Sequence, residues 1–516
     1  MTRALRWVTA AVVAGAGGCG HGGDDHSAIT PEELAAHVEA LGSEGEEEAS
    51  APGSRYDVAA AYVARTLELA RVTPGVQEPE GHPGFLQPVP LIRNLVGDGS
   101  MLEVTTARGT KRVPEGRRTF LLIAPGKAGQ AVPSRPPVFV GNGIHAPEHG
   151  VDDLAGLDLA GRPVLMTATP PDPKALAAMP DEVRSLYSDS DAAQYRRMSD
   201  LIDRGAAFVL LVPERWLLDE WDAMSAMRRR LDYAPVEQYG GQILQSPIPI
   251  VLIHADLVDW LFIGRSYHPI SHVGTYGSFE IDGFSIGLEI DVRREPRVTA
   301  NVLGVVPGDD RTLRDEYVIV SAQLDGASSD DKSVAVEDAA ACAALLEVAG
   351  AIARERPRRS VLLVFSIVEG GGAWGSLHLM AHLPVPREAV AAAIHVKRVG
   401  HPDAPFQTLE AMAAPPALAK EVEGAARRGR LEVTTSSRGV GAFKGTPAEV
   451  FLLAGIPSML VTIREPAMAD ADEDDDAGSS GLIEATHLLR LLVAETANAR
   501  SLAEARPKDA DVGLAR

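Results

Sequence analysis

Cysteine is nearly absent from this sequence. The 516 residues include two, Cys19 and Cys342. Cys342 lies in the alanine-rich stretch DAAACAALLEVAGAIA, where it is expected to be a small core residue of a helix. Two cysteines in such different surroundings provide no disulfide framework, and they exclude a zinc cluster built on cysteine.

Positive charge and long apolar runs are also scarce. The chain has 49 Lys and Arg against 71 Asp and Glu, which gives a formal net charge of -22. This balance argues against binding to nucleic acid or to anionic lipid headgroups. The apolar run near the N-terminus, residues 7–17, is too short to remain in a bilayer as a spanning helix. Apolar residues nevertheless make up 45% of the chain, so we expect a globular protein with two or three domains.

The first residues, MTRALRWVTAAVVAGAGGCG, resemble a bacterial lipoprotein signal. Two arginines precede the apolar run, and small residues then precede Cys19. Ala16 stands where such signals usually have leucine. We expect residues 1–19 to be a lipoprotein-type signal peptide with Cys19 as the lipidated residue, and residues 20–28 to be a flexible tether. The alternative is an ordinary secretion signal cut near the same place. Either signal predicts a protein of the bacterial cell envelope or a secreted one.

The remaining chain divides into segments by its hydrophobic patterns. ITPEELAAHVEAL predicts a helix capped by Thr30, and YDVAAAYVARTLELA predicts a second helix; both belong to residues 29–118, the N-terminal part of the main domain. Residues 119–290 contain short apolar strands and few helices, which predicts a separate β-rich unit. Residues 291–503 alternate strands and helices, and residues 504–516 form a tail. The alternation predicts an α/β fold, a mixed and mostly parallel sheet with helices on both faces.

Six stretches in one order resemble a known family. They are TANVLGVVPG, EYVIVSAQLDG, EDAAACAALLEVA, RSVLLVFSIVEGGGAWGS, AAAIHVKRVG and FLLAGIPSMLV. The chain is similar over roughly residues 29–500 to the co-catalytic di-zinc aminopeptidases, a family that also includes glutamate carboxypeptidase and the non-enzymatic transferrin receptor. Residues 119–290 resemble the protease-associated domain that is often inserted in these proteins.

The resemblance implies a site for two zinc ions, but this sequence departs from it at most ligand positions. In the family, two His and three carboxylates hold the metals, and a glutamate is the general base. The family's positions fall on Gln323 for the first His, Asp325 for its orienting Asp, Glu337 or Asp338 for the bridging carboxylate, Glu369 for the base, Gly370 for a Glu ligand and Lys397 for an Asp ligand. The last His would fall in the acidic segment ADADEDDDAGSSG, and His487 is expected on a helix surface. The family positions that are kept are therefore Asp325 and Glu369.

The substituted residues are poor ligands for zinc. Glycine has no donor atom, and glutamine offers a weak, neutral oxygen. A lysine ammonium about 5 Å from one Zn²⁺ would be repelled by roughly 6–7 kcal/mol at an effective dielectric constant near 20. We therefore predict that the protein binds no zinc pair and uses no cofactor. We hypothesise that the Lys397 ammonium occupies the vacated space and pairs with Glu337 or Glu369; the alternative is that Lys397 points to solvent.

Sequence motifs of other hydrolase types match this chain only in part. GFSIG, residues 283–287, matches the Gly-x-Ser-x-Gly motif, but the alternating residues that follow predict a strand where a nucleophile elbow needs a helix. Gly370–Gly372 are not followed by the Lys-Ser/Thr of a phosphate-binding loop.

Three functions remain open. The leading interpretation is a secreted or lipid-anchored member of the family that no longer catalyses and instead binds a peptide or protein partner, attached to the membrane through Cys19. The alternative is an active peptidase with one metal or an unusual ligand set, in which oxygen ligands from Asp338, Glu369 and Asp470–Asp476 would favour calcium, magnesium or manganese. The third is a fold remnant with a structural role in the cell envelope.

Overall fold

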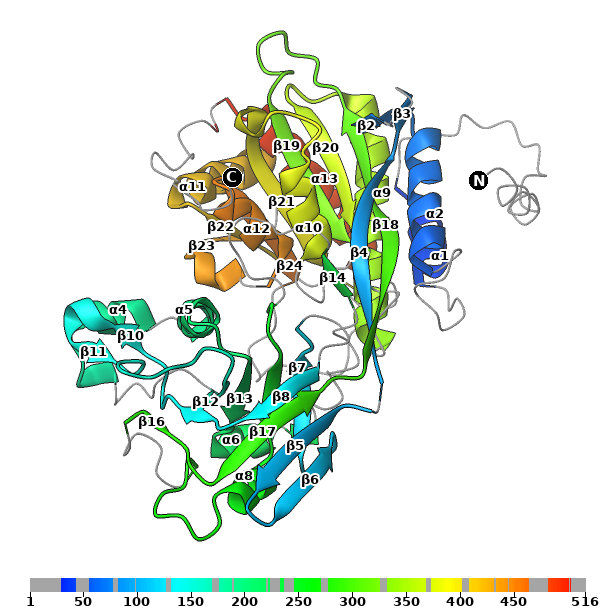
Figure 1. Ribbon diagram of the computed structural model, residues 1–516. Helices are drawn as coiled ribbons and strands as arrows, with labels where there is room; N and C mark the ends of the chain where they lie inside the picture. Colours follow the sequence, from blue (N-terminus) through cyan, green and yellow to red (C-terminus); the bar gives the residue numbers. More distant parts are fainter. Residues whose placement is uncertain are drawn as a thin grey trace, which may run out of the picture.

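The structure is a computed structural model (Figure 1). It describes residues 29–42, 55–77, 82–97, 99–126, 131–168, 176–187, 190–219, 221–222, 233–235, 246–270, 277–324, 332–367, 373–400, 408–430, 433–443, 445–463, 481–500 and 502. Four predicted site residues, Cys19, Asp325, Glu369 and Gly370, lie outside the described residues.

The helices and strands follow the predicted order. The helices are α1 (Pro31–Gly42), α2 (Arg55–Leu69), α4 (Asp181–Tyr187), α5 (Ser190–Asp203), α6 (Arg215–Asp219), α8 (Ala255–Leu261), α9 (Lys332–Glu355), α10 (Trp374–Ala381), α11 (Pro416–Gly429), α12 (Pro447–Leu453) and α13 (Gly481–Asn498). The strands of the main domain are β1 (Thr73–Pro74), β2 (Val76–Gln77), β3 (Pro83–Gly84), β4 (Leu86–Val96), β14 (Tyr233–Pro235), β18 (Val292–Val306), β19 (Tyr317–Gln323), β20 (Ser360–Ser366), β21 (Val390–Arg398), β22 (Leu409–Ala414), β23 (Val433–Ser437) and β24 (Ser458–Ile463). The inserted unit has β5 (Met101–Thr106), β6 (Gly109–Pro114), β7 (Phe120–Ala124), β8 (Ala131–Arg135), β9 (Val138–Phe139), β10 (His145–Ala146), β11 (Val151–Asp152), β12 (Pro163–Thr167), β13 (Phe208–Val212), β15 (Ile250–Ile253), β16 (Phe279–Glu280) and β17 (Phe284–Glu289).

The main domain is built on one large mixed sheet. Its strand order is β14-β4-β18-β20-β19-β21-β24-β22-β23, with β1 paired to β18. The four central strands, β20, β19, β21 and β24, run parallel. Buried side chains of α1, α2, α9, α11 and α13 pack on one face, and those of α10 and α12 pack on the other. The predicted α/β class, a mixed sheet with helices on both faces, is therefore confirmed, but the sheet is not mostly parallel, because β14, β4, β18 and β20 pair antiparallel, in that order along the sheet, and β22 pairs antiparallel with β24.

Local chemistry explains why these segments form these elements. All seven residues of β20 are buried, which its continuous apolar run requires of a strand covered by helices on both faces. The N-terminus of α1 has the predicted cap: the Glu33 backbone N–H donates to Thr30 Oγ1 at 3.2 Å, and the Thr30 hydroxyl donates to Glu33 Oε2 at 3.0 Å.

Along the chain, the inserted unit follows strand β4 and precedes strand β18. We call it the inserted lobe (Figure 1). It contains a sheet of order β16-β9-β12-β13-β15-β7 and a second of order β6-β5-β17-β8. Strands β5 and β6 belong to this lobe because β5 pairs along its whole length with β17. The lobe therefore begins near residue 101, and not at residue 119 as the sequence pattern predicted. The run of β-like residues before position 119 carries no local sign of which sheet it will join.

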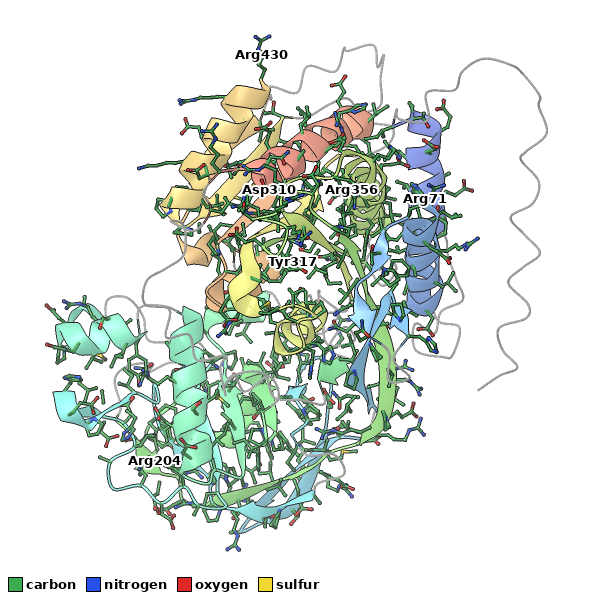
Figure 2. The ribbon with its side chains drawn as sticks, turned by 90° about the horizontal axis from the view of Figure 1, so that it is seen from above. Arg71, Arg204, Asp310, Tyr317, Arg356 and Arg430 are labelled. Carbon is green, nitrogen blue, oxygen red and sulfur yellow. The ribbon has the colours of Figure 1, made fainter. Side chains whose placement is uncertain are left out.

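Two labelled arginines mark the two parts of the molecule in Figure 2. Arg204, just after α5, lies in the inserted lobe, and Arg430 caps the far end of α11 in the main domain. Within the described part of the chain, none of the helices combines the length and the hydropathy that crossing a bilayer requires.

Candidate functional site

Three adjacent parallel strands end at the same edge of the main sheet. Gln323, the last residue of β19, pairs with Ser366, the last residue of β20. On the other side, Ala322 pairs with Val396 of β21, and Lys397 follows directly. Ligand sites of open α/β sheets lie at such carboxyl ends. The fold therefore brings Gln323 and Lys397, which are far apart in sequence, to neighbouring strand ends.

The side-chain amide of Gln323 is hydrogen-bonded to a carboxylate. Its Nε2 amide donates to Asp338 Oδ2 at 3.2 Å. Asp338 lies on α9 and is 5% exposed, so the bond compensates part of the cost of burying its charge. The Gln323 carbonyl in turn accepts from the Cys342 thiol, one helical turn further along α9, with a sulfur–oxygen distance of 3.2 Å. Cys342 is buried, as the sequence predicts.

Glu337 pairs with an arginine that the sequence motifs did not single out. Arg398 Nε lies 3.1 Å from Glu337 Oε2, and both side chains are about one-third exposed, at 35% and 29%. Among the described residues, Lys397 forms no ion pair with Glu337. For Glu337, the hypothesis of a pair with Lys397 is therefore corrected: the next residue along the strand makes it. The other half of the hypothesis concerns Glu369, outside the described residues.

A histidine is buried beneath these residues. His395 lies on β21, is fully buried, and places Nδ1 3.0 Å from the hydroxyl oxygen of Ser321 on β19. Burial, and then the nearby charge of Lys397, lower the pKa of His395 to about 3. His395 is therefore a neutral core residue at neutral pH.

A buried amide anchors the segment that leads toward Glu369. Asn301 of β18 donates through Nδ2 to the backbone carbonyl of Gly375 and to Gln87 Oε1, both at 2.9 Å. Its Oδ1 accepts from the backbone N–H of Ile367 at 3.2 Å. One side chain thus fixes the chain just before and just after residues 368–372. Asn301 was not among the predicted site residues, although it lies in the TANVLGVVPG stretch that carries the family resemblance.

The polar pair Gln323–Asp338 borders a small pocket. Leu324, Ala339 and Cys342 line it, together with Leu41 of α1 and Ala59 of α2. The N-terminal helices therefore close one side of the strand ends with apolar side chains.

The described residues do not fit a pair of zinc ions. In the part of the chain that the structure describes, no three His, Cys, Asp or Glu side chains gather into a group able to hold a metal. Among the described residues, the family's positions hold the Gln323 amide, the Asp338 carboxylate hydrogen-bonded to it, the Glu337 carboxylate in an ion pair with Arg398, and a lysine ammonium, which repels cations. His487 lies half-buried on α13, and burial, followed by the charge of Arg490, lowers its pKa.

A serine nucleophile is also excluded at the motif that the sequence offered. Ser285 lies inside β17, where it pairs with Thr105 of β5. A nucleophile elbow needs a sharp strand-to-helix turn at the serine, and this strand continues to Glu289.

Comparisons with known proteins agree with this architecture. Residues 301–479 match the model of peptidase family M28. The aminopeptidase from Aneurinibacillus sp. strain AM-1 is 15% identical, with 94% of this chain and 96% of that chain covered and a TM-score of 0.54. A zinc aminopeptidase from Bacillus subtilis is 12% identical, with 90% and 95% covered and a TM-score of 0.46. No curated protein matches the chain. Residues 301–479 of this chain are therefore similar to peptidase family M28, and the chain as a whole has the fold of the Aneurinibacillus aminopeptidase.

Proposed function

We propose that this protein is a non-catalytic member of the aminopeptidase-like proteins, held at or released from the cell envelope, that binds a peptide or protein partner at the carboxyl ends of its parallel strands. The observation that carries the proposal is the pairing of the two carboxylates on α9. Asp338 accepts from the Gln323 amide, and Glu337 pairs with Arg398. Carboxylates engaged in this way are not the free, convergent donors that a zinc pair needs.

Binding remains chemically reasonable at this edge without hydrolysis. The strand ends offer the half-buried Gln323 amide, the partly exposed pair of Glu337 and Arg398, and the ammonium of the half-buried Lys397. A peptide offers backbone donors and acceptors and charged groups that can bind such polar side chains. We further propose that the inserted lobe is a protease-associated domain that contributes to partner recognition.

The first test measures hydrolysis and bound metal together. The purified chain is assayed on a panel of aminoacyl anilides, with and without chelator, and its metal content is determined by mass spectrometry. We expect turnover at the background rate and less than one equivalent of zinc. Turnover that chelator removes and that Glu369→Gln abolishes would instead establish the alternative, an active peptidase with an unusual metal set.

The second test measures binding. A peptide library is titrated against the intact chain, and hydrogen exchange with and without a bound peptide locates the contact. We expect protection at the ends of β19 and β21, weakened by Lys397→Met. If hydrogen exchange at those strand ends is the same with and without peptide, the peptide binds elsewhere on the molecule.

The place of the protein in the cell rests on Cys19. We expect a Cys19→Ala variant to lose incorporation of radiolabelled palmitate and to leave the membrane fraction, because a thiol at that position is the acceptor of the lipid. Cys342→Ala is the matched control, since Cys342 is buried in α9, and it should keep the label. Equal labelling of both variants would contradict lipidation at Cys19.

A further inference from the structure

We infer that the Arg398 guanidinium is the resident cation of this site: it neutralises Glu337 from within the chain, in the place where aminopeptidases of this fold use metal. The inference concerns the same strand edge as the proposed function and rests on its premise that the edge holds no zinc pair. It goes further because it assigns a structural task to one residue, and its test does not involve peptide binding.

The geometry selects Arg398 and not its neighbour. Arg398 is the last residue of β21, paired with Thr462 of β24 across an irregularity that follows Val396. The pairing register between β21 and β24 therefore changes between Val396 and Arg398, at the end of the strand. Its Nε reaches Glu337 at 3.1 Å, across from the second turn of α9.

The chemistry of the pair suits a permanent charge. A guanidinium stays protonated at any pH that the folded protein experiences, and it offers several N–H donors in one plane. A metal ion at the same carboxylate would have to bind from solution, whereas Arg398 is part of the chain and lies beside Glu337 once the protein is folded. Because both side chains are about one-third exposed, the pair is partly screened by solvent, and its effect on stability is modest.

The pair also joins two elements that the fold must hold together. Gln323 ties α9 to β19, and Arg398 ties the same turn of α9 to β21. Two adjacent residues of one helix are thus fastened to two adjacent parallel strands. Removing Arg398 leaves Glu337 as an uncompensated carboxylate beside the buried Asp338, which favours the approach of another cation.

The test is a double-mutant cycle read by thermal unfolding of the full chain, with and without about 1 mM Mn²⁺, Zn²⁺ or Mg²⁺. The variants are Arg398→Met, Glu337→Gln and the two combined. We expect R398M to lower Tm by roughly 2–4 °C and the double variant to recover part of this loss, because it no longer contains an unpaired carboxylate. A divalent ion should raise the Tm of R398M by a few degrees and leave the wild type and the double variant unchanged.

Matched controls separate this site from the acidic surface. Arg427→Met removes the partner of Glu423 in an exposed pair on α11, and it should gain no response to metal. Arg398→Lys keeps the charge and should keep most of the Tm. If R398M does not fold, the comparison of Glu337→Gln with Arg398→Lys carries the test: the first should lose stability and the second should not.

Two outcomes would overturn the inference. An equal response of all variants to divalent ions would mean that the ions bind elsewhere, and additive effects of the two substitutions would mean that the residues are not coupled. Neither outcome depends on whether the protein binds peptides or hydrolyses anilides, so failure here is distinguishable from failure of the proposed function.

Discussion

Individual side chains at the sheet edge carry most of the functional argument. The sequence supplies their identities, so the loss of good zinc donors at Gln323 and Lys397 is evident from residue type alone. Their partners are a different matter. Nothing in the sequence says that the amide of Gln323 meets Asp338, or that Arg398 and not Lys397 meets Glu337. These choices depend on distances of a few ångströms between side chains of different elements.

At the same scale, His395 makes stability depend on pH. Its folded pKa of about 3 lies below the value near 6.5 of an unfolded histidine, so between these values the unfolded state binds more protons. Stability therefore falls as the pH decreases through this window, by up to about 1.4 kcal/mol per pH unit from this group. Urea unfolding of His395→Asn between pH 5 and about 6.5 should show a shallower fall than the wild type.

The control for that experiment is the exposed His82. His82→Asn should keep the wild-type pH dependence. If His395→Asn keeps it as well, the imidazole is not the group that titrates.

At the scale of elements, hydrophobic pattern and capping were sufficient to locate most helices and strands. The helix predicted after the Thr30 cap is α1, and the alanine-rich stretch around Cys342 lies in α9. The assignment of β5 and β6 to a lobe was not predictable, because alternation along a strand reports which residues are buried and not which sheet the strand joins. The partner strand β17 is more than 170 residues away in sequence from β5.

One glycine at an element boundary leads to a sharp prediction. A Cβ on Gly375, in the first turn of α10, would lie 2.4 Å from the Ile367 carbonyl oxygen and 2.5 Å from Asn301 Oδ1. Gly375→Ala should therefore lower the free energy of unfolding by about 1–3 kcal/mol, although alanine favours helix. Gly439→Ala, where a Cβ meets nothing within 4 Å, should change it by less than about 0.5 kcal/mol. Equal effects in denaturant titrations would contradict the described contact.

At the scale of the whole molecule, the chain enters the inserted lobe after β4 of the main sheet and returns from it into β18. The main domain has its core around α9 and the central strands, and the inserted lobe has cores of its own around β12 and β13. Separate cores imply that a change inside the lobe need not propagate to the sheet edge where the candidate site lies.

Arg197 is the residue with which to test this independence. It is fully buried on α5, donates to the carbonyl and hydroxyl oxygens of Thr167 and to Gln194, and burial lowers its pKa to about 10, so it stays charged at neutral pH. Arg197→Met should destabilise the lobe by about 3 kcal/mol, because buried oxygen atoms lose their donor. Hydrogen exchange should quicken in β12 and β13 and stay unchanged in β19 and β21.

A matched substitution in the same lobe is Arg112→Met, which breaks an exposed pair with Glu289. It should have little effect in either region. Faster exchange in β19 after Arg197→Met would show that the main domain and the inserted lobe unfold as one.

The sequence by itself determined the alternation of helices and strands and the α/β class. It also showed that the residues at the family's metal positions are poor donors for zinc, because periodicity and residue type are local properties. Only the tertiary structure decided that the inserted lobe starts near residue 101, that Asn301 fixes both ends of residues 368–372, and that Arg398 is the partner of Glu337. Each of these depends on contacts between distant segments, which close packing fixes to fractions of an ångström and which no local pattern encodes.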